Sequence, residues 1–146
     1  MPRALLVLFL LVAAFAAVTL VALEGNEVAV MRTTADDGSA RETRVWVAEH
    51  DGALWVEAAT PERAFYRDLL ARPEIEIVRG DAVLPVLARP QPGAEGHALI
   101  RSLLAAKYGW ADWWVGLLQD TSGSIAVRLD PDPARAGEAS PERTSR

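Results

Sequence analysis

Residues 33–56 read TTADDGSARETRVWVAEHDGALWV, and this stretch decides the fold. Apolar and polar residues alternate on either side of two turn-forming segments, a pattern typical of half-buried strands. The pattern predicts a strand, a polar turn at residues 36–40, a second strand, a tight turn at Asp51-Gly52 and a third strand. Asp-Gly between two alternating runs favours a hairpin, because glycine adopts the positive φ that such turns need.

Two arginines follow the first turn. Arg41 and Arg44 can hold a phosphate or a carboxylate, because a guanidinium donates two parallel hydrogen bonds to either group. The alternative is a solvent-exposed hairpin in which these arginines pair with Glu42 and Glu49. The pattern alone leaves both interpretations open.

The composition excludes several classes of protein. The chain has 146 residues and a formal net charge of −5, and no basic surface is evident, so we expect no nucleic-acid partner. Cysteine is absent, which excludes disulfides, thiol catalysis and cysteine-ligated metals. His50 and His97 are the only histidines, and we expect both to be exposed and no metal to be bound.

Residues 130–146 contain no large apolar side chain and are predicted to be a disordered tail.

The N-terminus is one apolar unit. Residues 4–23 carry no charge and can cross a bilayer as a helix, since about 20 such residues span its core. The alternative is a cleaved signal peptide, although its apolar region is usually shorter, about 7–15 residues. We expect an uncleaved, single-pass membrane anchor over residues 1–23. Arg3 precedes this span and Glu27 follows it, so the positive-inside bias favours a cytoplasmic N-terminus and a domain on the outer side of the membrane.

The remaining pattern predicts one small, mainly β domain over residues 24–129. Its expected strands are 28–34, 43–50, 53–58, 74–79, 82–89 and 124–129, and its expected helices are 60–72, 94–107 and 111–119. Thr60-Pro61 is the expected start of the first helix, because threonine is a good cap and proline fits the first turn. Pro85 predicts an edge position or a bulge, and residues 90–93 a loop. Six short strands suggest a small barrel.

Tryptophan is the most informative residue outside this hairpin. Trp110, Trp113, Trp114 and Leu117 follow helical i, i+3, i+4, i+7 spacing. This stripe is consistent with core packing, with a membrane-interface belt near the anchor, or with the wall of a cofactor site. No motif for a catalytic residue is present, so the catalytic residues stay unknown. A cofactor enzyme does not need such a motif, because the cofactor supplies the reactive atom.

Three segments carry a family resemblance: the hairpin with Arg41-x-x-Arg44-Val45-Trp46, FYRDLLARPEI at residues 65–75, and AAKYG at residues 105–109. Over residues 28–129 the chain resembles the deazaflavin-dependent nitroreductase family. The resemblance implies a split β-barrel, shared with pyridoxamine-phosphate oxidase-like flavin proteins. It also implies an oxidoreductase that transfers hydride from a reduced deazaflavin of the F420 type, or from FMN, to a quinone, nitro compound or similar electrophile. Many members are dimeric or membrane-associated.

The same resemblance implies a set of cofactor-binding residues. By analogy, Arg41, Thr43 and Arg44 hold the phosphate end of the cofactor and Trp46 lines its ring. Arg67, Lys107 and Tyr108 are expected to make secondary contacts. One departure from the family is the first turn, where Asp36 and Asp37 replace basic residues and would repel a phosphate. This departure keeps an alternative open, a membrane-tethered barrel that serves as a non-catalytic binding or interaction module.

Overall fold

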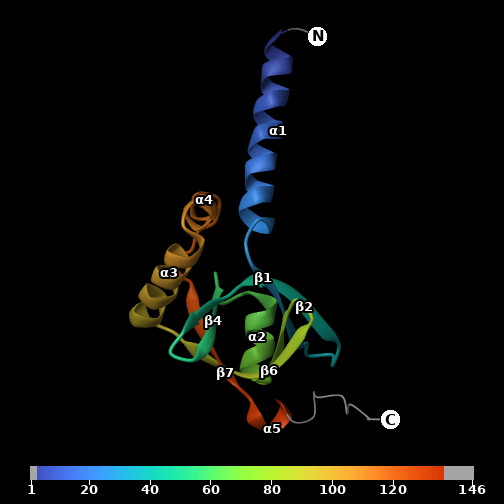
Figure 1. Cartoon of the computed structure of the whole chain (residues 1–146), viewed down its shortest axis with the longest axis vertical. Helices are drawn as coiled ribbons and strands as arrows, with labels where there is room; N and C mark the ends of the chain where they lie inside the picture. The colour runs from blue at the N-terminus through green and yellow to red at the C-terminus, as the bar shows by residue number, and fades with distance from the viewer. Residues whose placement is uncertain (1–2, 137–146) are drawn as a thin grey trace, which may run out of the picture.

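The computed structural model describes residues 3–136, and its core is a seven-stranded antiparallel sheet. In chain order the elements are α1 (Arg3–Glu24), β1 (Val28–Thr34), β2 (Ala40–Trp46), β3 (Ala48–His50), β4 (Ala53–Ala58), α2 (Ala64–Ala71), β5 (Glu74–Arg79), β6 (Ala82–Gln91), α3 (Ala94–Tyr108), α4 (Trp110–Leu118), β7 (Ile125–Pro131) and α5 (Pro133–Ala136). Figure 1 shows α1 extending away from the curled sheet, with α2 among the strands.

The topology requires the sheet to curl. Its strand order is β2-β1-β5-β6-β7-β4-β3, so β2 and β3 are the two ends of the sheet. Only Val47 separates these two strands in the chain, and the two ends of the sheet must therefore come close together. This closure, with helices packed on the sheet, fits a split β-barrel, as the resemblance implies.

Two groups of buried side chains hold the helices on the sheet. Inside the curl, Phe65 and Leu69 of α2 pack against apolar residues of β1, β5, β6 and β7, such as Met31 and Ile77. The second group covers β3, β4 and β7 from the other side. It comprises Ala48, Trp55, Ile100, Leu104, Tyr108 and Ala126. Because Trp55 belongs to this second group, β4 is covered on both of its faces.

The strand predicted over residues 43–50 is in fact two strands. β2 pairs with β1 as far as Trp46, and β3 pairs with β4 from Ala48 onward. Between them, the Val47 N–H donates to the hydroxyl of Tyr108 at 3.1 Å, and that hydroxyl lies 2.9 Å from the Val47 carbonyl oxygen. A side chain thus satisfies the backbone groups that a neighbouring strand would otherwise pair.

The helix expected from Thr60 begins later, at Ala64. Residues 60–63 form a turn, closed by a bond of 3.3 Å from the Arg63 N–H to the Thr60 carbonyl. Arg63 has ψ of 129°, an extended value, so the helix cannot begin before it. Pro90 and Gln91, expected in a loop, continue β6.

Pro85 lies inside β6 but at a position with little cost. It is opposite Glu76 of β5, whereas pairing with β7 begins only at Val86. On its β7 side the Pro85 carbonyl oxygen accepts the Asp132 N–H at 3.0 Å, just beyond the end of β7, and the missing N–H is tolerated because the β6–β7 ladder does not reach Pro85.

Order continues beyond residue 129, where a disordered tail was expected. β7 runs to Pro131, and Asp132 is buried. The Asp132 carboxylate accepts the Ala134 N–H at 3.1 Å and so caps α5, which proline begins well. Residues 137–146, the rest of the predicted tail, lie outside the described residues.

Candidate functional site

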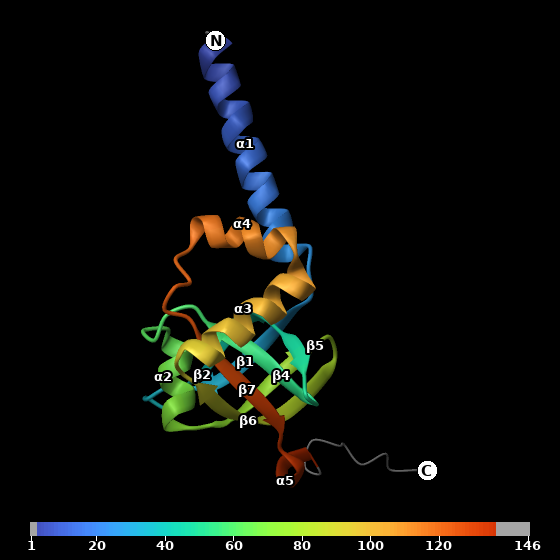
Figure 2. The ribbon, with the colours of Figure 1, turned by 90° about the vertical axis from the view of Figure 1, so that its left-hand side faces the viewer.

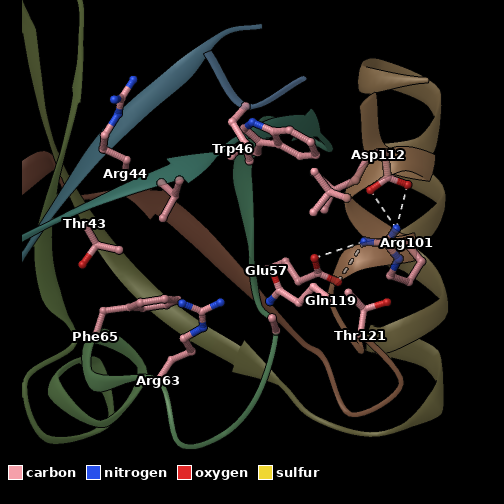
Figure 3. Close-up of a pocket in the computed structure, with 16 residues that line it drawn as sticks. Thr43, Arg44, Trp46, Glu57, Arg63, Phe65, Arg101, Asp112, Gln119 and Thr121 are labelled. Atoms are coloured by element: carbon pink, nitrogen blue, oxygen red, sulfur yellow. Dashed lines mark hydrogen bonds and ion pairs between the residues drawn. The ribbon is translucent and has the colours of Figure 1, made fainter. Parts of the chain in front are cut away.

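A cavity of ≈ 180 Å³ lies where the barrel does not close by hydrogen bonds (Figure 3). Its walls come from the free edge of β2, from β4 and the segment that leads to α2, and from α3 and α4. Leu23 at the end of α1 completes the lining. Because β2 pairs only with β1, some of its backbone N–H and C=O groups face this gap and can bond a ligand.

One side of the cavity is cationic. Thr43 and Arg44 come from β2, and Arg63 comes from the turn before α2. Both arginines are exposed, and Arg63 makes no ion pair with any residue in the range 3–136. In Figure 3 Arg63 lies alongside Phe65. In Figure 3 the Arg44 side chain is directed away from Arg63 and Thr43, so this side offers an anion the Arg63 guanidinium and the Thr43 hydroxyl.

The neighbouring wall is aromatic and apolar. Trp46, at the end of β2, stacks on Tyr108 with ring centroids 4.5 Å apart and planes inclined by 14°. Phe65 and Leu104 line the cavity with it. The Tyr108 hydroxyl is held by the backbone of Val47, between β2 and β3, and of Glu27, just before β1, so α3 fixes the position of the Trp46 ring. A flat, conjugated ligand would find a preformed surface here.

The wall at α3 and α4 carries a cation that is already paired. Arg101 donates to both oxygens of Glu57 at 3.1 Å and to those of Asp112 at 2.6 and 2.7 Å. Burial opposes the charge of Arg101, but these hydrogen bonds raise the pKa of its guanidinium above the usual value. Because two carboxylates surround one guanidinium, this wall favours no anion and instead fastens α4 to the barrel.

The structure separates the seven residues expected to bind a cofactor. Thr43, Arg44 and Trp46 line the cavity. Arg41, Arg67, Lys107 and Tyr108 do not.

Three of those outside the cavity have other partners. The Arg41 Nε donates to the buried Asp68 at 2.7 Å. Lys107 pairs with Glu27 at 2.8 Å and Glu49 at 3.0 Å. The buried hydroxyl of Tyr108 bonds to the backbone, as described above.

Arg67 and the acidic turn lie apart from the cavity as well. Arg67 is exposed on α2. Asp37 accepts bonds from the backbone and hydroxyl of Ser39, which lower the pKa of its carboxyl group. Neither Asp36 nor Asp37 lines the cavity, so their charges do not face its cationic side.

Arg63 and Phe65 are among the cavity residues that the pattern missed. Both follow Thr60-Pro61, which was interpreted as the start of a helix. An extended residue at 63 instead directs this segment toward β2. The signal that could have found them is the arginine two residues before the FYRDLLARP segment.

Two further features carry less chemistry. A cavity of ≈ 560 Å³ between β6, β7 and the β3–β4 turn is almost entirely apolar and contains none of the expected residues. His50 and His97 are partly buried rather than exposed, and His97 Nδ1 lies 2.9 Å from the hydroxyl of Ser124. Across residues 3–136, no group of three potential ligands that could hold a metal ion is present.

Comparison with known proteins agrees with this fold. A conserved hypothetical protein from Mycobacterium tuberculosis is 16% identical, with 80% of this chain and 79% of that chain covered and a TM-score of 0.58. An F420-H2 dependent reductase (FDR-A) is 19% identical, with coverages of 71% and 94% and a TM-score of 0.54. A putative pyridoxamine 5'-phosphate oxidase from Listeria innocua is 15% identical, with coverages of 77% and 90% and a TM-score of 0.55.

At these identities the solved structures establish the fold alone. No protein with a curated functional description matches the chain significantly. The family model described as F420H(2)-dependent quinone reductase, however, matches residues 12–130, which is most of the chain. The chain therefore belongs to the F420H2-dependent quinone reductase family, deazaflavin-dependent oxidoreductases whose cofactor is F420.

Proposed function

We propose that this protein is a membrane-tethered reductase that binds F420H2 in the cavity at the edge of β2 and reduces a quinone. The observation that carries the proposal is the division of that cavity between polar groups suited to an anion, Arg63 and Thr43, and aromatic side chains, Trp46 and Phe65. F420 has the matching division, because it joins a flat deazaflavin ring to a phosphate and an anionic glutamate tail.

The residues present fit such a cofactor. Charge-assisted hydrogen bonds from Arg63 and Thr43 would hold the phosphate end. Trp46, Phe65 and Leu104 would contact the ring. The cavity, at ≈ 180 Å³, is smaller than the typical range of about 300–1,000 Å³ for small-molecule sites, so it accommodates only part of the cofactor. Because Arg63 is exposed, the anionic tail can extend into solvent.

When bound, the cofactor supplies a hydride, and a quinone that accepts this hydride and one proton becomes a hydroquinone. The chain's own part is to orient the ring and to keep water from one of its faces. The apolar lining at Leu23, Leu104 and Val115 suits a quinone better than a strongly polar acceptor.

Tethering through α1 is the second element of the proposal. Its 18-residue apolar window has a mean hydropathy of 3.0, and none of that window is buried against the rest of the chain. A signal sequence would pass the same test. Retention of α1 is favoured by its contacts with α4: the Trp114 indole N–H donates to Thr19 at 3.1 Å, and the Phe15 and Trp114 rings lie 5.5 Å apart.

The test is a titration of the full chain in detergent micelles with oxidised F420, and anaerobically with F420H2, followed by cofactor fluorescence. Arg63→Ala should weaken binding about 10- to 150-fold, the equivalent of about 1.5–3 kcal/mol for charged hydrogen bonds. Arg67→Ala is the matched control, because it removes an exposed arginine four residues away that does not line the cavity.

Each outcome has a clear meaning. Equal effects of the two variants would contradict the placement of the phosphate. A folded chain that binds neither form of F420 would overturn the reductase proposal and favour the non-catalytic, tethered module. Turnover of bound F420H2 with menadione, a soluble quinone, tests the acceptor class. Intact mass spectrometry of the membrane-extracted chain tests whether α1 is retained, and its native mass tests the homodimer that the resemblance implies.

A further inference from the structure

The helix α4 exposes an unusually apolar surface. Trp110, Trp113, Leu117 and Leu118 are 55%, 63%, 62% and 50% exposed. The sequence left open whether the tryptophan stripe packs in the core. These exposures show that most of the stripe does not. Clusters of large exposed apolar side chains usually mark an interaction site. The question is what covers this one.

The position of α4 along α1 points to the bilayer. Trp114 contacts α1 at Phe15 and Thr19. At 1.5 Å per residue, these contacts lie about 12 Å and about 6 Å inside the end of the apolar span at Leu23. Helices that lie in a membrane interface bury their apolar face about 5–10 Å into it. The depth set by α1 therefore matches the depth at which an interfacial helix rests.

The orientation and charge of α4 agree with this position. Figure 2 shows α4 running across the direction of α1 rather than along it, so α4 lies along the membrane plane if α1 crosses the membrane. The only charged residue of α4 is Asp112, which is buried and bonded to Arg101. No charge of α4 therefore has to enter the apolar region. Tryptophan is also enriched at membrane interfaces.

We propose that α4 is an in-plane helix that embeds Trp110, Trp113, Leu117 and Leu118 in the interface of the lipid bilayer beside α1. The inference rests on the proposed tethering through α1, and not on the cofactor. It also orients the cavity relative to the membrane. The cavity wall formed by Leu23 of α1 and by Val115 and Gly116 of α4 then lies at the bilayer surface. An acceptor dissolved in the lipid then reaches the cavity without crossing water.

The absence of cysteine makes a direct test possible, because each introduced cysteine is the only one to be labelled. Full-length Trp113→Cys and Leu117→Cys are labelled with a nitroxide and reconstituted into phosphatidylcholine–phosphatidylglycerol vesicles. Electron paramagnetic resonance then compares collisions of the label with oxygen, which partitions into lipid, and with a water-soluble nickel(II) complex. Leu8→Cys in α1 and Glu62→Cys, exposed before α2, are the lipid and water references.

We expect the ratio of oxygen to nickel(II) accessibility at positions 113 and 117 to exceed that at 62 several-fold and to approach that at 8. If position 8 lies in lipid but 113 and 117 match 62, the inference is overturned while the tether stands. Low accessibility to both reagents at 113 and 117 would indicate a protein partner or a second copy, and would also overturn it. If position 8 itself is in water, the tether fails and the inference with it. The circular dichroism spectrum of each labelled variant, compared with that of the unmodified chain, checks its fold without reference to the cofactor.

Discussion

The two ends of β2 carry the same kind of residue and do different things. At its start, Arg41 is fastened to Asp68 of α2, whose carboxylate also accepts the Thr33 hydroxyl at 2.7 Å. Toward its end, Arg44 lines the cavity beside Trp46. Two residues three apart in a strand project from opposite faces, so one phosphate cannot easily use both.

What separates the two ends is the helix that each one meets. Asp68 is only 4% exposed, and a buried carboxylate needs a partner, which Arg41 supplies. The other end meets α3, whose neutral Tyr108 stacks on Trp46, and Arg63 lines the cavity that opens there. The start of β2 therefore contributes to stability, and its end contributes to the site.

The largest expected effect comes from removing Asp68, which holds the start of β2 in place. Asp68→Ala leaves the buried Thr33 hydroxyl without its acceptor, while the partly exposed Arg41 can be hydrated. We expect a loss of about 2–4 kcal/mol of unfolding free energy. This corresponds to a melting temperature lower by about 10–20 °C for a domain of this size.

Differential scanning fluorimetry of the full chain in detergent measures this shift, with Asp81→Ala, in the exposed β5–β6 turn, as the control. Binding of F420 to the folded fraction should stay within about two-fold of that of the unmodified chain, because Asp68 does not reach the cavity. A loss of affinity as large as that of Arg63→Ala would show that the two ends act as one site.

A smaller effect is expected from removing the Tyr108 hydroxyl, through which α3 supports the end of β2. Burial raises the pKa of the Tyr108 hydroxyl, so it stays protonated and donates to the carbonyl oxygen of Val47 or of Glu27, each 2.9 Å away. Tyr108→Phe keeps the stack on Trp46 but leaves buried backbone groups unpaired. The expected cost is about 1–3 kcal/mol of unfolding free energy.

Tyr66→Phe is the control, since that side chain is also buried but its hydroxyl bonds to no residue between 3 and 136. Urea unfolding in detergent compares the two variants. If both cost the same, the hydroxyl of Tyr108 is not what holds the β2–β3 junction.

The fold followed from the sequence where the relevant forces are local. β1, β4 and β5 have the bounds that alternation predicts, and the tight turn has positive φ at Asp51 (49°) and Gly52 (70°). The break at Val47 could not be predicted, because Tyr108, which makes it, lies 61 residues away. Local patterns determine elements, whereas a side chain from another element can end one.

The candidate site was predicted only in part, for the same reason. Thr43, Arg44 and Trp46 were predicted correctly as cavity residues because they lie along one strand. No local sequence pattern reveals that Arg41 pairs with Asp68 of another element. Arg63 was missed because a good helix-start signal at Thr60-Pro61 is overridden by a turn. Helical spacing identified the apolar stripe of α4 without indicating which partner, if any, covers it.

The smallest expected effect concerns a charge network at the Tyr108 end, where Glu27 and Glu49 meet Lys107 and Arg79. Hydrogen bonds from Lys107 and Arg79 lower the pKa of Glu27 below its ordinary 4.5. Burial opposes the charge of Glu49, but the same two cations lower the pKa of its carboxyl group as well.

A folded-state pKa below the unfolded value means that the unfolded chain takes up protons first as the pH falls. The stability from this network is therefore complete above pH 4.5 and is lost as the pH falls through the lowered values. Melting temperatures measured from about pH 3 to about pH 6 should fall on the acid side, and less steeply in Lys107→Met, which has already lost the shared cation. Glu62→Gln, at an exposed position, should keep the full slope. Equal slopes in the parent chain and Lys107→Met would assign the acid sensitivity to other carboxylates and leave Tyr108 alone as the support of this end of β2.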